Sequence, residues 1–490
     1  MAGLLERYRF AFLGAFTMFY FMGTALRARS SPLWHDEIYT ILMSRLDLAH
    51  MWQAARQGVD PTPPLTDIVV RGFTALWGEG NIVSRLPAMI GFWVFCISLF
   101  AFVRRRLDIQ YAFAAMLLPF SSGAYWYAIQ ARCYGLLLGF VGIALVSWQA
   151  AAAGRRRVLA LPLLAIALAL LLFSHFYAFL LLMPLCGAEL WRAARSRRVD
   201  WPVWGALAAG SAAATALSFP LVAGSAHFRG HPFAIPSLHN LVSFYPDLLQ
   251  SMITVLMGFL LLSSAWWVLG GGTARVSVRR IPDHELVAAV LLVMIPVAGL
   301  AVAELVTKMF TPRYFLSALA GVVLLVVFMT SVWSRGSAAL GALLLIASGL
   351  SAARVIAHHL PYQEPVDNNP LLRQAIAQGP VVMDDGVTFL EQWYYLPEAL
   401  KSRVSYVADP AFDYRWVGHD TVDVGMLGLR RWFGVTALDY AQVHRPGATF
   451  RIYHNSSGPA WLLQKLLEDG VRIELLASSG DRAVLRATVP

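Results

Sequence analysis

The chain has 490 residues, of which 58% are hydrophobic and only 14% are charged. Soluble proteins keep about a quarter of their residues charged, so this composition excludes an ordinary soluble protein and indicates a membrane protein. The net charge is +10, but the arginines concentrate in short connectors between apolar runs, which argues against nucleic acid as a partner.

Eleven apolar runs are predicted to cross the membrane as helices, because about 17–25 apolar residues suffice for one crossing. Arg27 and Arg29 follow the first run without a clear small-residue cleavage site, so we expect an uncleaved span. Cys96, Cys133 and Cys186 lie in or beside such runs and are interpreted as small hydrophobic residues. The predicted spans are 10–26, 86–103, 109–127, 133–153, 158–173, 176–191, 203–223, 248–270, 286–306, 314–333 and 336–356.

The charges of the connectors predict how the chain is oriented. With the N-terminus in the cytoplasm, the cytoplasmic connectors hold the arginine clusters at 104–106, 155–157 and 192–198. The first outer loop, 27–85, has six arginines and six acidic residues and is neutral. This asymmetry follows the positive-inside rule. We therefore expect a multi-pass protein of the bacterial inner membrane, with the loop 27–85 and the C-terminus on the periplasmic side.

Two segments of the first loop have helical spacing. Apolar residues recur at this spacing within 42–54 and within 65–76, the second segment starting after Pro63-Pro64. Nothing else in the sequence is expected to cover their apolar faces, so they are predicted to be amphipathic helices in the outer membrane–water interface. The alternative is a small soluble domain formed by the loop.

The polar tail is predicted to be a small extracytoplasmic α/β domain. It begins with a linker containing Pro361, Pro365 and Pro370. Strand-like runs and helical patterns then alternate. The predicted fold class is therefore a polytopic all-α bundle, residues 1–356, followed by a soluble domain, residues 357–490. The expected strands are 381–383, 404–407, 450–453, 473–476 and 483–489, and the expected helices are 370–378, 387–396 and 459–469.

Asp36 and Glu37 are the first candidates for chemistry, because they lie just past the end of the first span. Adjacent carboxylates beside an apolar boundary are costly unless they are paired or used. The alternative interpretation is a solvated loop end in which the aspartate caps a helix.

A second group of candidates is predicted to gather at the outer face. Arg132 opens the fourth span, His175 and Tyr177 lie between two short spans, and Arg313 and Tyr314 begin the tenth. Each arginine alone is more often a snorkelling anchor. Guanidinium groups also bind phosphate through paired charge-assisted hydrogen bonds. Their convergence on the face with few arginines favours a phosphate site.

These segments resemble the GT-C integral-membrane glycosyltransferases, especially the group of the protein O-mannosyltransferases and the lipid A aminoarabinose transferase. The resemblance is carried by Trp-His-Asp-Glu at 34–37, Pro-Pro-Leu at 63–65 and Ser-Arg-Leu-Pro at 84–87. Segments 130–134, 174–177 and 312–314 are similar to later segments of that group, in the same order. The resemblance covers roughly residues 10–330.

The resemblance implies a polyprenyl-phosphate sugar donor, an outer-face active site and inversion at the anomeric carbon. The catalytic carboxylate of the group maps onto Asp36, with Glu37 beside it. Many relatives have a histidine at the position of Thr62. This departure leaves open whether the acceptor is a lipid, a glycan or a protein, and the sugar, a hexose or a pentose, is also open.

The chemistry of the transfer assigns a role to each candidate. An acceptor hydroxyl must lose a proton as it attacks the sugar, so Asp36 is the expected general base and Glu37 positions the acceptor or Asp36. The departing phosphate gains negative charge, which cations stabilise. Arg132 and Arg313 are the main candidates for that role. Arg85, His175, Tyr177 and Tyr314 are further ones.

The sequence has no evident metal-ligand cluster, so no obligatory metal or other cofactor is expected. Two other function classes stay open at this point. A lipid or solute transporter would place charges near the midplane of the membrane and often has repeated halves, whereas here the polar candidates lie at one face and no repeat is visible. A non-catalytic membrane scaffold is the other class.

Overall fold

The computed structural model describes all residues except 1, 269–280, 332–369, 457 and 459. The chain divides into two compact units. The first, here called the helical unit, comprises Met1–Ser30, Thr62–Phe219 and Pro236–Pro361, and the second, the mixed unit, comprises Ser31–Pro61, Pro220–Ile235 and Tyr362–Pro490. The predicted boundary at 356–357 and the first two linker prolines lie outside the described residues, so the boundary stays a prediction.

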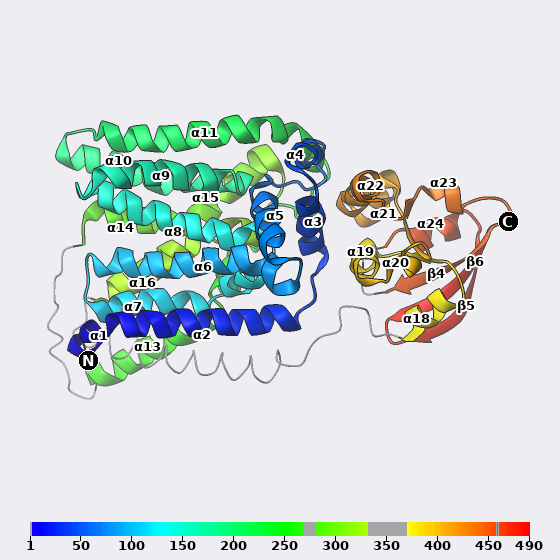
Figure 1. Cartoon of the computed structure of the whole chain (residues 1–490), viewed down its shortest axis with the longest axis horizontal. Helices are drawn as coiled ribbons and strands as arrows, with labels where there is room; N and C mark the ends of the chain where they lie inside the picture. The colour runs from blue at the N-terminus through cyan, green and yellow to red at the C-terminus, as the bar shows by residue number, and fades with distance from the viewer. Residues whose placement is uncertain (1, 269–280, 332–369, 457, 459) are drawn as a thin grey trace. The chain divides into compact units, whose positions relative to one another are not determined.

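The helical unit is a bundle whose long helices run roughly along one direction (Figure 1). Its helices are α1 (Ala2–Arg7), α2 (Arg9–Ser30), α5 (Leu65–Trp77), α6 (Asn81–Arg104), α7 (Ile109–Leu117), α8 (Cys133–Ala152), α9 (Arg157–Leu172), α10 (Leu182–Ser196), α11 (Trp201–Ser225), α12 (Leu238–Leu249), α13 (Ser251–Val268), α14 (Asp283–Val293), α15 (Ile295–Val302) and α16 (Ala318–Ser331). Short 3-10 helices η1 (Leu118–Ser121), η2 (Gly123–Ile129), η3 (Phe176–Leu181) and η6 (Pro312–Phe315) connect some of them.

The membrane spans are confirmed in part. Within the described residues five helices are long and apolar enough to cross a membrane, and two bent helix pairs raise the number to at most seven. Three further predicted spans are shorter apolar helices, Ile109–Ser121, Arg157–Leu172 and Ala318–Ser331. The predicted span 336–356 lies outside the described residues. The expected number of eleven is therefore not confirmed.

Proline explains one of the bends. The pair Asp283–Val293 and Ile295–Thr307 is bent by 48°, and Pro296 stands in the first turn of its second helix. Because proline has no N–H to donate and its ring clashes with the preceding turn, a continuous helix is interrupted there. Apolar length alone did not reveal this break.

Helices α6 and α8 approach each other closely through glycine. A Cβ atom at Gly135 would lie 2.4 Å from the carbonyl oxygen of Ala88, and one at Gly139 would lie 2.7 Å from that of Gly91. Small residues four apart allow helix backbones in membranes to pack at such short range. This packing fixes the start of α8, where Arg132 stands.

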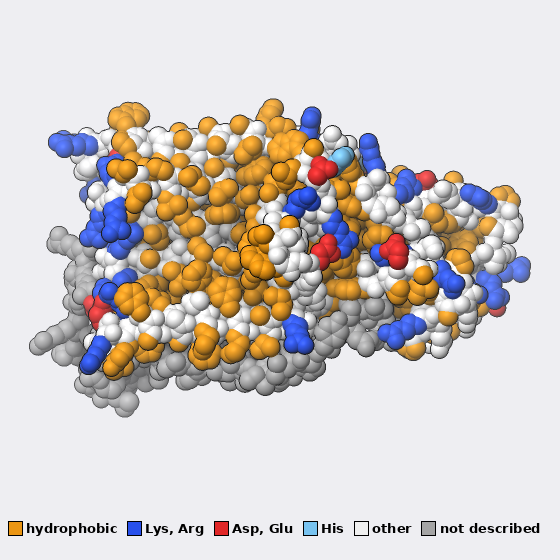
Figure 2. All heavy atoms as spheres, in the orientation of Figure 1, with side chains coloured by type: hydrophobic (Ala, Val, Ile, Leu, Met, Phe, Trp, Pro, Cys, Tyr) orange, Lys and Arg blue, Asp and Glu red, His pale blue; other side chains and the backbone are white. Residues whose placement is uncertain are grey.

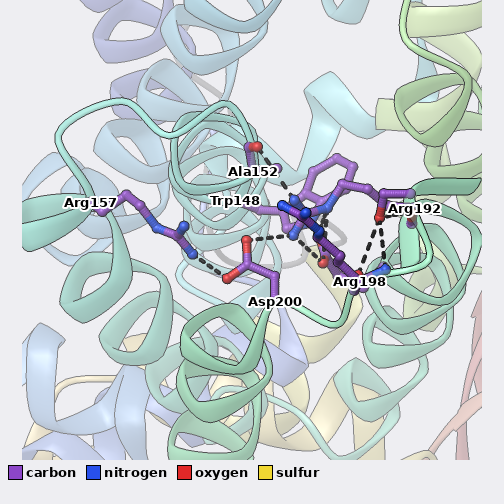
Figure 3. A network of polar contacts seen from close by, with 8 residues as sticks. Trp148, Ala152, Arg157, Arg192, Arg198 and Asp200 are labelled. Atoms are coloured by element: carbon purple, nitrogen blue, oxygen red, sulfur yellow. Dashed lines mark hydrogen bonds and ion pairs between the residues drawn. The ribbon is translucent and has the colours of Figure 1, made fainter.

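Arginines gather at the end of the bundle that carries the connectors α6–α7, α8–α9 and α10–α11 (Figures 1 and 2). Many of them are paired with acids. Arg192 binds Glu189 at 2.6 Å and Asp200 at 2.8 Å, and Arg157 also pairs with Asp200 (Figure 3). Glu189 is buried and accepts a hydrogen bond of 2.7 Å from the Trp148 indole. This network joins α8, α9 and α10 at the predicted cytoplasmic end of the bundle.

The mixed unit contains a six-stranded sheet with the order β3-β2-β1-β4-β6-β5. The strands β1 to β4 run parallel where they pair, and β6 pairs antiparallel with both β4 and β5. The predicted α/β composition of the tail is therefore confirmed, and each expected strand is present. The strands are β1 (Val381–Met383), β2 (Val404–Val407), β3 (Ala437–Leu438), β4 (Thr449–Asn455), β5 (Arg472–Ser479) and β6 (Arg482–Thr488).

The tail has more helices than the sequence patterns indicated. The three expected helices correspond to α18 (Pro370–Ala377), α19 (Gly386–Tyr395) and α24 (Leu462–Glu468). The unit also contains α20 (Glu398–Lys401), α21 (Pro410–Val417), α22 (Thr421–Phe433) and α23 (Tyr440–Val443). Most of these are short, and such segments have little periodicity to detect.

Part of the first loop packs within the mixed unit. Its helices α3 (His35–Arg45) and α4 (Leu48–Arg56) correspond to the first predicted segment. Helix α3 contacts α19, and Ile38, Ile41 and Met43 are fully buried. The expectation that no other part of the chain covers this apolar face is therefore wrong for α3. The second predicted helix, α5, packs on α6 and leaves Leu76 and Trp77 exposed.

Candidate active site

Arg132, His175 and Arg313 come together in the helical unit. Arg132 is the N-cap residue of α8 and is largely buried, and Arg313 lies in η6. His175 is buried between α9 and η3. Burial, together with the smaller effect of the nearby positive charges of Arg313 and Arg132, lowers the pKa of His175 to about 3. His175 is therefore neutral at pH 7, so the two arginines supply the positive charge of this group.

Two tyrosines complete this group, which we call the cationic cluster: Arg132, His175, Tyr177, Arg313 and Tyr314. The ring of Tyr314 lies 4.4 Å from that of His175 and 5.0 Å from that of Tyr177. The Tyr177 hydroxyl donates to the carbonyl oxygen of Met309. Five of the six predicted phosphate-site residues are thus neighbours in the fold, although they come from three distant segments of the chain.

Arg85, the sixth predicted residue, has a different environment. It is 2% exposed, and its Nη1 donates a hydrogen bond of 2.7 Å to the carbonyl oxygen of Ala28 in α2. That contact ties α6 to α2. Its assignment to the phosphate site stays a prediction.

A cavity of about 250 Å³ opens beside Arg313. One wall carries the polar side chains of Asp247 and Gln250. Trp126 and Tyr127 contribute aromatic surface. Hydrogen-bonding groups next to aromatic faces suit a sugar ring, whose hydroxyls are polar and whose C–H faces are apolar. The sequence did not indicate Asp247 or Gln250, because neither lies in a recognisable motif.

Asp36 and Glu37 lie in the first turn of α3, in the mixed unit. The N-cap residue is Trp34, so Asp36 is not the cap of this helix and the capping alternative is wrong. The Asp36 side chain is 19% exposed, and its Oδ1 is 3.4 Å from His35 Nδ1. Glu37 is fully buried, and its Oε2 accepts a hydrogen bond of 3.2 Å from the Trp34 amide. Of the two carboxylates, Asp36 is the accessible one.

Helix α19 holds the segment that carries Asp36. The His35 amide donates a hydrogen bond of 3.0 Å to Glu391, and the Leu33 amide donates one of 2.6 Å to the Tyr395 hydroxyl oxygen. Burial raises the pKa of Glu391. This role of Glu391 was not predictable from the sequence, since 356 positions separate the two partners.

One potential metal-ligand group is found among the described residues: His227, His231 and Asp420. It also lies in the mixed unit, away from every predicted site residue in sequence. The two histidines are four positions apart, a spacing that often places two ligands on one side of a turn. The spacing of the two histidines is visible in the sequence. Asp420 could not be assigned to the group from the sequence, because it lies far along the chain from them.

No protein-family model and no curated protein sequence matches the chain. Among solved structures, the crystal structure of ArnT from Cupriavidus metallidurans in the apo state covers 98% of this chain and 98% of its own, with a TM-score of 0.53 and 12% identity. The chain has the fold of this ArnT. ArnT is a GT-C lipid A aminoarabinose transferase, so the resemblance predicted from the motifs is confirmed at the level of the fold.

A second solved structure, ArnT from Cupriavidus metallidurans bound to undecaprenyl phosphate, also matches. It covers 97% of each chain, with a TM-score of 0.43 and 13% identity.

Proposed function

We propose that the protein is an inverting glycosyltransferase that moves a sugar from a polyprenyl-phosphate donor to an acceptor on the periplasmic face of the bacterial inner membrane. The observation that carries the proposal is the cationic cluster, in which Arg132 and Arg313 are near one another and Arg313 also lines a cavity. Two guanidinium groups match a phosphate that gains charge as it leaves. The motif resemblance and the ArnT-like fold support the same donor class.

In this proposal the two arginines hold the donor phosphate. His175 is neutral and buried, so it acts as a hydrogen-bonding and packing group beside them. The cavity next to Arg313 receives the sugar, with Asp247 and Gln250 available to its hydroxyl groups. The polyprenyl chain extends along the apolar surface of the bundle.

Asp36 is the proposed general base. The acceptor oxygen attacks the anomeric carbon, the bond from that carbon to the phosphate oxygen breaks, and the acceptor proton passes to Asp36. A single displacement inverts the configuration and releases polyprenyl phosphate. The Glu37 carboxylate accepts a hydrogen bond from the Trp34 amide and so stabilises the first turn of α3. We therefore assign Glu37 to positioning Asp36, which narrows the two roles expected from the sequence.

The test is turnover by purified protein in lipid nanodiscs. Polyprenyl-phosphate donors carrying radiolabelled pentoses and hexoses are supplied with periplasmic-face lipid, glycan and protein acceptors. The expected result is a labelled acceptor and released polyprenyl phosphate, both identified by mass spectrometry. A protein that moves labelled lipid between leaflets without breaking the sugar–phosphate bond would be a transporter, and the proposal would be wrong.

A further inference from the structure

His227 and His231 both lie within hydrogen-bond distance of one carboxylate oxygen, Asp420 Oδ2. His227 opens η4 (His227–Arg229), in the connector between α11 and α12, and Asp420 is the N-cap residue of α22. Asp420 Oδ2 is 2.8 Å from His227 Nε2 and 2.6 Å from His231 Nδ1. All three potential ligand atoms lie within 4.8 Å of one another. The connector and Asp420 belong to the same unit.

The burial of these residues favours an ion more than a pair of surface hydrogen bonds. The Asp420 side chain is only 1% exposed, whereas those of His227 and His231 are 45% and 33% exposed. Asp420 Oδ1 is buried and has no hydrogen-bond partner among the described residues. A buried carboxylate costs free energy unless charge and hydrogen bonds compensate it. The half-exposed histidines leave a path from solvent by which a cation can enter.

The ligand types point to zinc. Two imidazole nitrogens and one carboxylate oxygen are a common zinc set, with ligand distances near 2.0–2.2 Å. Tetrahedral ligands at that distance are about 3.3 Å from each other, so the present 2.6 and 2.8 Å separations need to grow by less than ~1 Å. Calcium and magnesium prefer oxygen ligands only, which makes the two imidazoles unfavourable for them.

We propose that His227, His231 and Asp420 bind one Zn²⁺, with a water molecule in the fourth position. The ion fixes the connector between α11 and α12 to the residues that start α22, which are separated from it by some 190 positions in the sequence. The ring of Tyr414 lies 4.1 Å from that of His231 at 28°, which holds this imidazole in orientation.

The test uses the full-length protein, purified through a tag without histidine, stripped with a chelator and dialysed. Zn²⁺ is then titrated and counted by elemental analysis, and Co²⁺ is used as a visible-light probe of tetrahedral coordination. We expect one ion per chain in the wild type. His227→Ala, His231→Ala and Asp420→Asn should each weaken binding at least ~10-fold.

His239→Ala is the matched control, because His239 is an exposed histidine in α12 outside the cluster. It should bind zinc like the wild type. In hydrogen exchange, zinc should slow exchange of residues 220–235 in the wild type and in this control only.

Two results would overturn the proposal. One is a wild-type protein that binds no stoichiometric zinc or cobalt, which would make the group a hydrogen-bonded triad only. The other is unchanged zinc binding in all three cluster variants, which would place the ion elsewhere. Because the side chains of His227 and His231 are partly exposed, their variants are expected to stay folded, and size-exclusion chromatography checks this for each protein.

Discussion

Asp36 and Glu37 are adjacent in sequence but have different environments in α3. Glu37 is fully buried and accepts a hydrogen bond from the Trp34 amide. The Asp36 side chain, in contrast, is 19% exposed and lies beside His35. The sequence selected the pair, because two carboxylates at an apolar boundary are unusual. It did not separate their roles, since these depend on the direction in which each side chain leaves the helix.

Arg132 and Arg313 provide the first prediction. If they hold the donor phosphate, Arg→Ala at either position should weaken donor binding by roughly 10- to 100-fold, because a charge-assisted hydrogen bond contributes about 1.5–3 kcal/mol. Arg→Lys should restore only part of the affinity, since an ammonium group cannot form the paired contacts of guanidinium. Binding is measured with a labelled polyprenyl-phosphate sugar.

The matched control for this measurement is Arg195→Ala. Arg195 belongs to the same unit, and its side chain is 70% exposed at the end of α10, so donor affinity should not change. Wild-type affinity in both the Arg132→Ala and Arg313→Ala proteins would remove these residues from the site and favour the snorkelling interpretation.

At the scale of elements, glycine substitutions test the close packing of α6 against α8. Gly135→Ala would place a methyl group 2.4 Å from a backbone oxygen of α6, and such overpacking costs about 1–3 kcal/mol. We expect a lower unfolding temperature and weaker donor binding, because Arg132 precedes this helix. Gly23→Ala in α2 meets nothing within 4 Å. It should be neutral or slightly stabilising, and equal effects of the two substitutions would contradict the packing argument.

Asp413, in helix α21, is expected to make the stability of this region depend on pH. Burial, and then the charge of Asp423, raise the pKa of Asp413 to about 8. The ordinary pKa of an aspartate, which applies in the unfolded chain, is 3.8. Between these two pKa values the folded state therefore keeps a proton that the unfolded state has lost. The stability of this region should therefore fall as pH rises from about 4 to about 8.

Asp413→Asn should flatten this dependence and protect α21 at pH values near 8, as measured by hydrogen exchange of the full-length protein across that range. Asp439→Asn is the control, because the side chain of Asp439 is 56% exposed. If the Asp413→Asn protein retains the wild-type pH slope, Asp413 does not titrate in this window.

Most regular elements were predictable from the sequence, and the exceptions have physical causes. Strands of the C-terminal sheet and the helices of the first loop follow from their apolar periodicity. The bend beside Pro296 divides one regular-looking apolar stretch, the predicted span 286–306, into two helices. The cover of α3 by α19 was not predictable, because the partner lies some 350 positions further along the chain.

At the scale of the whole molecule, the fold is shared with ArnT at only 12% identity over nearly the full chain. A membrane bundle needs apolar residues of the right length more than particular side chains, so the sequence can diverge while the architecture persists. The five members of the cationic cluster, by contrast, were identified from particular residues in the segments 130–134, 174–177 and 312–314. The group of His227, His231 and Asp420 depends on a tertiary contact and left only the histidine spacing as a sign.

The topology prediction also belongs to this scale. A reporter that is active only outside the cytoplasm should be active when fused after residue 356, and inactive when fused within 192–200, where the arginines cluster. Residues 192–200 include the connector between α10 and α11, at the arginine-rich end of the bundle (Figures 1 and 2). A cytoplasmic C-terminus would contradict the assignment of the loop 27–85 to the periplasmic side.

The most direct measurement for the whole account is sugar transfer by the Asp36→Asn protein. Asparagine keeps the shape of the side chain but cannot accept the acceptor proton, so turnover should fall at least ~10²-fold. Donor affinity should stay close to that of the wild type. Stability should change little, because loss of one charge in the first turn of a helix costs only about 0.3–1 kcal/mol. An Asp36→Asn protein that transfers sugar at the wild-type rate would contradict the proposed mechanism.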